Sequence, residues 1–290
     1  MSAATSGART VRTRDSRPSV LATALLMLGA VYCLVPVAWV LVAATKSGAD
    51  LFSTFTFAPG THLFANIADL SAYRGGLFWR WMLNTVLYAG VGAALSTLVS
   101  AMAGFGLAKY EFLGKSTFFN LILAGVLVPG VILAIPQYLL VARVGMADTY
   151  WSVLLPSIIS PYGIYLARIY ATASVPDELV EAARADGASE ARLFVLVALP
   201  IMRSGLVTVF LFQFVGIWNN FMLPYIMLGS DRLFPVTVGL NGLLNQGATQ
   251  PALYTLVITG ALLSILPLVA LFLLLQRFWQ VDLAAGAVKA

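Results

Sequence analysis

Long runs of apolar residues, separated by shorter polar segments, dominate the pattern of this 290-residue chain. A helix needs about 20 mainly apolar residues to cross the hydrocarbon core of a bilayer, because no water is present there to bind its backbone polar groups. Six runs approach or exceed that length, at residues 20–44, 83–108, 117–141, 150–167, 204–228 and 254–276. The sequence therefore predicts an all-α integral membrane protein with six transmembrane helices.

The charged residues lie between these runs. The chain is 60% hydrophobic and only 10% charged, and none of its 17 basic and 12 acidic residues falls inside the six windows. A charge within the bilayer is costly and usually marks an ion pathway or proton relay. Its absence argues against a proton-coupled pump.

The positions of Lys and Arg predict the orientation, because cytoplasmic loops retain these residues. With the N-terminus inside, 12 basic residues fall on the inner side and five on the outer side. We therefore expect both termini in the cytoplasm, with residues 1–19 as a disordered arm and residues 277–290 as a C-terminal tail. The net charge of +5 then reflects membrane topology and requires no nucleic acid partner.

The second apolar run has small residues at steps of four, which are Gly92, Ser96, Ser100 and Gly104. Small residues at that spacing let membrane helices approach closely, so this helix is expected to be the most enclosed by protein. The single cysteine, Cys33, is interpreted as a buried apolar residue, because one cysteine makes no disulfide framework.

Two outer segments have distinctive compositions. The first, residues 46–81, is expected to lie at the membrane interface because of its aromatic residues, Phe52, Phe55, Phe57, Phe64, Phe78, Trp79 and Trp81. The second, residues 229–251, is expected to be a loop rich in Gly, Asn and Gln. Long loops of this kind are often functional.

The inner segment at residues 174–203 predicts a helix-turn-helix. Ser174 is the expected N-cap, and Asp177 and Glu178 then complement the dipole of the first turn. Gly187 is expected to end this helix in the left-handed conformation, and a second helix is expected from about Ser189. The alanines between them leave a surface on which another protein can approach the backbone closely.

This segment resembles the cytoplasmic loop of ABC importer permeases, whose pattern is EAA, three residues, Gly, nine residues, Ile, one residue, Leu-Pro. Val197 replaces Ile, and the other matched positions are Glu181, Ala182, Ala183, Gly187, Leu199 and Pro200. Asp186 and the following residues, with the Trp218-Asn219-Asn220-Phe221 motif, further resemble the carbohydrate-uptake branch, which is similar to the maltose-type inner-membrane permease subunit.

The resemblance implies a non-catalytic subunit in the bacterial cytoplasmic membrane that imports a sugar, a di- or oligosaccharide. It implies a second homologous permease, two ATPase subunits that hold ATP and magnesium, an extracytoplasmic solute-binding protein and membrane lipid as partners. No cofactor, metal or nucleic acid is expected on this chain. The residues expected to couple to the ATPase are Glu181, Ala182, Ala183, Asp186, Gly187, Leu199 and Pro200.

Polar and aromatic residues inside the spans are candidates for the substrate pathway, because sugars present hydroxyls to amides and apolar faces to aromatic rings. These are Asn84, Gln137, Tyr138, Gln213, Trp218, Asn219 and Asn220. Hydrogen bonding between helices is the alternative role. The resemblance also suggests contacts with the binding protein in the second outer segment, at Leu240, Asn241, Gly242, Asn245 and Gln246.

The sequence gives less support to other functions. Gly114-Lys115-Ser116-Thr117 imitates the end of a P-loop but lacks its first glycine, so ATP hydrolysis is assigned to another chain. His62 is the only histidine, and no catalytic cluster is visible. Import of glycerol phosphate is the alternative function, followed by ion-coupled transport and a membrane enzyme.

Overall fold

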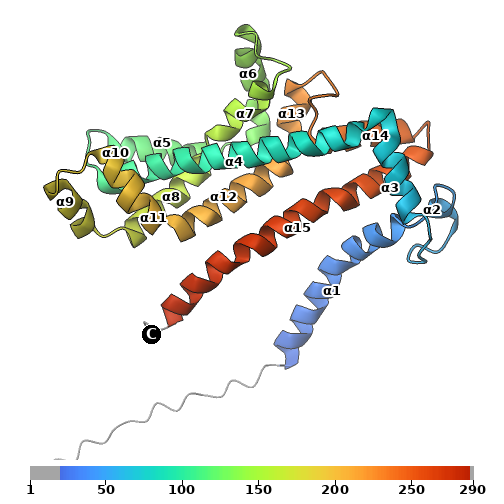
Figure 1. Ribbon diagram of the computed structural model, residues 1–290, viewed down its shortest axis with the longest axis horizontal. Helices are drawn as coiled ribbons and strands as arrows, with labels where there is room; N and C mark the ends of the chain where they lie inside the picture. The colour runs from blue at the N-terminus through green and yellow to red at the C-terminus, as the bar shows by residue number, and fades with distance from the viewer. Residues whose placement is uncertain (1–19, 288–290) are drawn as a thin grey trace, which may run out of the picture.

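The computed structural model describes residues 20–287, and within them it contains helices and connecting segments but no strand (Figure 1). The long helices are α1 (Val20–Ala43), α4 (Leu77–Lys109) and α15 (Ala252–Ala287). The remaining helices are α2 (Asp50–Ser53), α3 (Leu63–Ala72), α5 (Lys115–Leu127), α6 (Gly130–Arg143), α7 (Tyr150–Ile158), α8 (Pro161–Ser174), α9 (Asp177–Ala185), α10 (Glu190–Leu193), α11 (Leu199–Ile201), α12 (Arg203–Trp218), α13 (Met222–Met227) and α14 (Val236–Gly247). The expected arm at residues 1–19 lies outside the described residues.

Four helical stretches are long and apolar enough to span a membrane, and two bent pairs raise the number of candidates to six. The four are α1, α4, the α7–α8 stretch and the apolar part of α15. The pair α5–α6 bends by 105°, and the helix at Glu190–Ile201 meets α12 at 83°. The all-helical class is thus confirmed, while three of the six expected runs, at residues 117–141, 150–167 and 204–228, are each divided between two helices.

The apolar run at residues 117–141 is not one continuous helix, because α5 ends at Leu127 and α6 begins at Gly130. Val128 and Pro129 between them are extended. Proline has no amide hydrogen to donate and disfavours helical geometry at the residue before it, which accounts for a break at this point. The helix expected at 204–228 similarly ends at Trp218 and resumes only at Met222.

Helix α4 forms the centre of the bundle and packs against α8, α12 and α7. Its row of small residues faces these partners, as the sequence predicts: Ser96 and Ser100 are fully buried. A Cβ atom on Gly104 would lie 2.6 Å from the backbone nitrogen of Arg168 and 2.7 Å from Ala167 Cβ. Of the four candidate spans, α4 has the largest buried share of its apolar window, at 39%.

The outer aromatic segment divides into two groups. Phe52, Phe55 and Phe64 are exposed, as an interfacial position requires. Phe78 and Trp81 are buried in the core, so the interfacial assignment is wrong for these two residues. The reason is that α4 begins at Leu77, six residues before the expected position 83, and carries both rings into its packed face.

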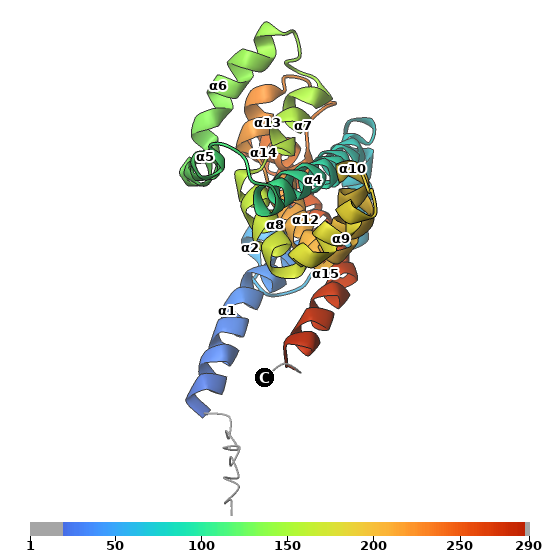
Figure 2. The ribbon, with the colours of Figure 1, turned by 90° about the vertical axis from the view of Figure 1, so that its left-hand side faces the viewer.

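The helices α1 and α15 extend away from the bundle on the same side of the molecule (Figures 1 and 2). None of the apolar window of α1 is buried within the chain. Cys33 lies on this helix and is exposed, so the expectation that it is buried is wrong for the chain alone. The expected C-terminal tail from residue 277 instead continues α15 as far as Ala287.

Candidate functional site

Helix α9 starts at Asp177, two residues later than an N-cap at Ser174 would place it. The expected N-cap, Ser174, is wrong: it is the last residue of α8. The cap position is occupied by Pro176, which is extended and makes no side-chain cap hydrogen bond. Asp177 and Glu178 do lie in the first turn, where their negative charges complement the helix dipole.

The turn after α9 has the geometry that its sequence predicts. Gly187 has a φ of +77°, a conformation that costs a residue with a side chain roughly 1 kcal/mol or more. Its amide donates to the carbonyl of Arg184 at 3.0 Å, and the amide of Ala188 donates to the carbonyl of Ala183 at 3.0 Å. These two bonds are a Schellman motif, which satisfies carbonyls at the end of α9.

The second helix begins at the expected serine. The side chain of Ser189 accepts a hydrogen bond from the Arg192 amide at 3.4 Å, and α10 follows directly. The helix then widens into a π-helical turn at Phe194–Ala198 and closes with α11, which contains Leu199 and Pro200. The wide turn accommodates Pro200, which cannot donate the next backbone hydrogen bond.

The helix pair is held by one buried face and leaves the other face open. Val180 and Leu193 are buried and join a core cluster with residues of α4 and α8, including Phe105 and Ala171. The remaining coupling candidates fall as follows: Glu181, Ala182, Asp186, Gly187 and Pro200 are exposed, and Ala183 and Leu199 are half-buried. The open face has little side-chain bulk around Ala182.

Ionic contacts tie the helix pair to the end of α4. Lys109 Nζ lies 2.6 Å from Asp177 Oδ1. The Tyr110 hydroxyl donates to Glu190 Oε2 at 2.5 Å, and Arg184 Nε donates to Glu190 Oε1 at 3.0 Å. These contacts were not anticipated from the sequence, because residues 109–110 and 177–190 are far apart along the chain.

The pKa values in this cluster shift in the directions that preserve it. The Arg184 guanidinium, and then the Tyr110 hydroxyl, lower the pKa of Glu190 below its ordinary 4.5. Partial burial, followed by the hydrogen bond to Glu190, raises the pKa of Tyr110 to about 12. The cluster weakens as pH falls through the depressed pKa of Glu190 or rises through that of Tyr110, so it persists across the physiological range.

A cavity of about 450 Å³ lies among α5, α6, α7, α8, α12 and α13. Three of the seven pathway candidates line it, Gln137, Gln213 and Asn220, together with Ser157 and Ser160. Gln213 Nε2 donates to Ser160 Oγ at 2.7 Å. The described lining contains no charged and no aromatic side chain, and apart from these amides and hydroxyls it is mostly apolar.

The other four candidates do not line this cavity. Asn84 donates to the carbonyls of Arg232 and Phe234 and accepts from the Tyr150 hydroxyl, which is the alternative, structural role. Trp218 is buried and stacks on Phe214, Tyr138 packs against a core cluster, and the exposed Asn219 donates to the Val215 carbonyl.

Ser157 and Ser160 were not expected at the cavity from the sequence. Ser160 becomes available to the cavity because the helix breaks at Ile159 and Ser160, after which Ser160 caps α8 by accepting from the Gly163 amide at 3.0 Å. Pro161 directly after a serine is the signal that would have indicated this cap.

The outer segment at residues 229–251 is not the expected loop, because most of it forms α14. Gly239 permits this helix to lie against α4, since a Cβ there would fall 2.2 Å from the Trp81 ring. The contact candidates Leu240, Asn241 and Gly242 are half-buried, whereas Asn245 and Gln246 are exposed near the end of the helix. Leu240 packs against the core, so its side chain is only partly available.

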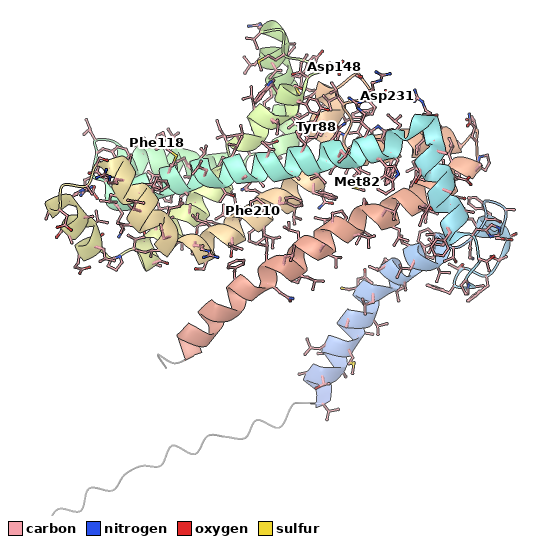
Figure 3. The ribbon with its side chains drawn as sticks, viewed as in Figure 1. Met82, Tyr88, Phe118, Asp148, Phe210 and Asp231 are labelled. Atoms are coloured by element: carbon pink, nitrogen blue, oxygen red, sulfur yellow. The ribbon has the colours of Figure 1, made fainter. Side chains whose placement is uncertain are left out.

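The end of α4 near Trp81 holds the segment before α14, residues 229–235, through hydrogen bonds to backbone groups. Trp81 Nε1 donates to the Asp231 carbonyl at 2.8 Å, and the Val236 amide donates to Thr85 Oγ1 at 2.7 Å. Asp148 Oδ1 accepts from the amides of Gly229 and Ser230, and Asp148 and Asp231 both lie beside this end of α4 (Figure 3). The described structure therefore fixes this segment firmly.

A bundle of apolar helices with an open amphipathic helix pair defines a multi-pass membrane protein of the permease class. The chain belongs to the family of binding-protein-dependent transport system inner membrane components, whose model matches residues 96–280. It is accordingly a protein of the cytoplasmic membrane and a carbohydrate-branch ABC importer permease by family.

Several permease proteins are similar over most of their length. The arabinooligosaccharides transport system permease protein AraQ of Halalkalibacterium halodurans is 35% identical, over 81% of this chain and 83% of the relative. The lactose transport system permease protein LacG of Rhizobium radiobacter is 31% identical, over 95% and 98%. The sn-glycerol-3-phosphate transport system permease protein UgpE of Escherichia coli is 29% identical, over 91% and 95%.

A solved structure has the same fold. It is a chain of a bacterial ABC transporter involved in the import of the acidic polysaccharide alginate, with a TM-score of 0.76 and 21% sequence identity. The match covers 89% of this chain and 95% of that chain. The arrangement of helices described above is thus that of an ABC importer permease.

Proposed function

We propose that this chain is the permease subunit of an ATP-driven sugar importer and that α9 docks into a cleft of a separate ATPase subunit. The open face of α9 around Glu181 and Ala182, beside the half-buried Ala183, carries this proposal. Its backbone is accessible because alanine has no bulk, while Val180 anchors the opposite face in the core. A short helix supported in this way can transmit force from a partner to the bundle.

A sugar is the preferred solute. AraQ and LacG are named for transport of arabinooligosaccharides and lactose, and the neutral cavity suits hydroxyl groups. The UgpE relative supports glycerol phosphate as the second candidate. A phosphate would favour basic residues on the pathway, and the described cavity lining has none.

The proposed topology has six spans, with both termini and the coupling segment 174–203 in the cytoplasm. It rests on the excess of Lys and Arg in the inner segments. The broken α5–α6 and α12–α13 stretches each serve as one span. Non-helical backbone at membrane depth is tolerated where it is enclosed by protein or lines a cavity, and the α5–α6 break adjoins the cavity.

The working complex contains a second homologous permease, two ATPase subunits and an extracytoplasmic binding protein. ATP and magnesium are held by the ATPase subunits, and this chain acts without catalysing a reaction. We assign the contact with the binding protein to α14, where Asn245 and Gln246 present exposed amides. The family description, which specifies binding-protein-dependent transport, supports this assembly.

The substitution Ala182→Trp tests the docking of α9. In proteoliposomes containing the whole complex, we expect it to reduce ATP-dependent uptake at least about tenfold, because one ring would block the close approach. Ser116→Trp is the matched control, since Ser116 is also small and exposed but lies in the other inner segment. Normal uptake by Ala182→Trp would contradict docking through this face.

A further inference from the structure

Two consecutive residues, Lys109 at the end of α4 and Tyr110 directly after it, hold the two ends of α9, the first directly and the second through Glu190 of α10. Lys109 pairs with Asp177, the first residue of α9. Tyr110 donates to Glu190, and the same carboxylate binds Arg184, which lies in the last turn of α9. Together with the buried Val180, these two separated contacts fix the direction of the short helix α9.

Lys109 and Tyr110, the residues that make these contacts from the α4 side, pack against the rest of the protein. The side chain of Lys109 is 6% exposed, whereas that of Asp177 is 78% exposed. The Tyr110 ring packs edge-to-face against Phe105, with 5.7 Å between ring centroids, and Phe105 in turn contacts Phe194. The contacts therefore join a helix end that packs against the core to an exposed helix that is open to a partner.

Helix α4 continues without a break to the other functional regions. Its 33 residues span about 50 Å at 1.5 Å per residue, from α9 and α10 at one end to α14 at the other (Figure 1). Midway, Gly92 faces Ser157 and Ile217, both of which line the cavity. At the outer end, Trp81 and Thr85 hold the segment before α14.

We propose that Lys109 and Tyr110 form a two-point clamp through which α4 carries a displacement of α9 to the cavity wall and the outer segment. Both are positioning residues, because neither lines the described cavity nor belongs to the exposed face of α9. The inference rests on the proposed function, since it requires an ATPase subunit to displace α9. Loss of the clamp should uncouple ATP hydrolysis from uptake while leaving the ATPase bound.

A charge-reversal series tests the clamp in proteoliposomes containing the complete complex. The readouts are the number of ATP molecules hydrolysed per solute imported and the amount of ATPase that co-purifies with the permease. We expect Lys109→Glu or Asp177→Lys alone to raise that ratio about fivefold or more, within the usual range of coupling between sites. The double variant should return the ratio toward the wild-type value, because it restores the ion pair with its charges exchanged. A merely structural role would instead lower the amount of ATPase that co-purifies.

Two further variants complete the test. Tyr110→Phe keeps the ring packing but removes the hydroxyl, so it should also raise the ratio in a complex that assembles normally. Lys115→Ala is the control, because it removes a 2.8 Å ion pair with Glu111 in the same inner segment without touching α9. It should leave the ratio unchanged.

The outcomes separate the clamp from the docking proposal. A wild-type ratio in both Lys109→Glu and Tyr110→Phe, with the ATPase still bound, would overturn the clamp alone. Failure of the double variant to improve on either single variant would also overturn it. If ATPase binding and uptake are both indifferent to Ala182→Trp, the docking of α9 fails instead.

Discussion

Gly104 lies at a close crossing of α4 and α8, and a single methyl group there would overlap the backbone of the facing helix. The Cβ of Gly104→Ala would lie 2.6 to 2.7 Å from three atoms of Ala167 and Arg168. Because these atoms belong to the backbone or to a Cβ, they cannot move aside as a flexible side chain would. The two helices must instead move apart. This movement separates α4, whose end contacts α9, from α8, which precedes α9 in the chain.

We expect Gly104→Ala to destabilise the protein by about 1 to 3 kcal/mol, the usual cost of overpacking. Thermal unfolding of the purified chain in detergent measures this change. Gly90→Ala is the matched control, since Gly90 is on the same helix and has no atom within 4 Å of its added Cβ. It should be neutral or slightly stabilising, and equal losses for the two variants would contradict the close crossing.

At the scale of elements, the sequence predicts where helices run better than where they bend. The apolar runs, the small-residue row on α4 and the turn at Gly187 follow from local rules of length, spacing and backbone conformation. The break between α5 and α6 depends on tertiary packing as well as on Pro129. Other prolines, such as Pro136 and Pro156, lie inside helices.

The candidate site likewise has one part that the sequence predicts, the helix pair, and one part that it does not, the cavity. The helix pair around Gly187 is encoded in consecutive residues, so its geometry could be expected apart from the start of α9. The cavity draws on six helices, α5 to α8, α12 and α13, and no sequence spacing brings Gln137, Ser160 and Gln213 together. Choosing pathway candidates by chemical type alone also picks out Asn84 and Trp218, but the side chains of both make their contacts inside the protein.

A matched pair of amide variants tests the cavity as the solute pathway. Gln213→Ala removes an amide that lines the cavity, whereas Asn219→Ala removes an exposed amide outside it. We expect Gln213→Ala to lower uptake roughly five- to tenfold, because a lost hydrogen bond to a neutral group is worth about 1 kcal/mol. Asn219→Ala should keep near wild-type uptake, and the reverse order would place the pathway elsewhere.

At the scale of the whole molecule, α4 lies between two functional regions. One end holds the helix pair proposed to receive the ATPase, and the other holds the segment that leads into α14. The helices α1 and α15 extend from this bundle, and none of the apolar window of α1 is buried within the chain. This large apolar surface agrees with a chain that lies in lipid beside a second permease.

Contact between α9 and the ATPase subunit is the central claim, and site-directed photocross-linking tests it most directly. Cys33 is the only cysteine, so a Cys33→Ser background with Ala182→Cys gives one attachment point for a benzophenone probe. In the assembled, active complex, we predict a product of permease joined to ATPase from this position and none from Ser116→Cys. An active complex in which the probe at position 182 never reaches the ATPase would contradict the account.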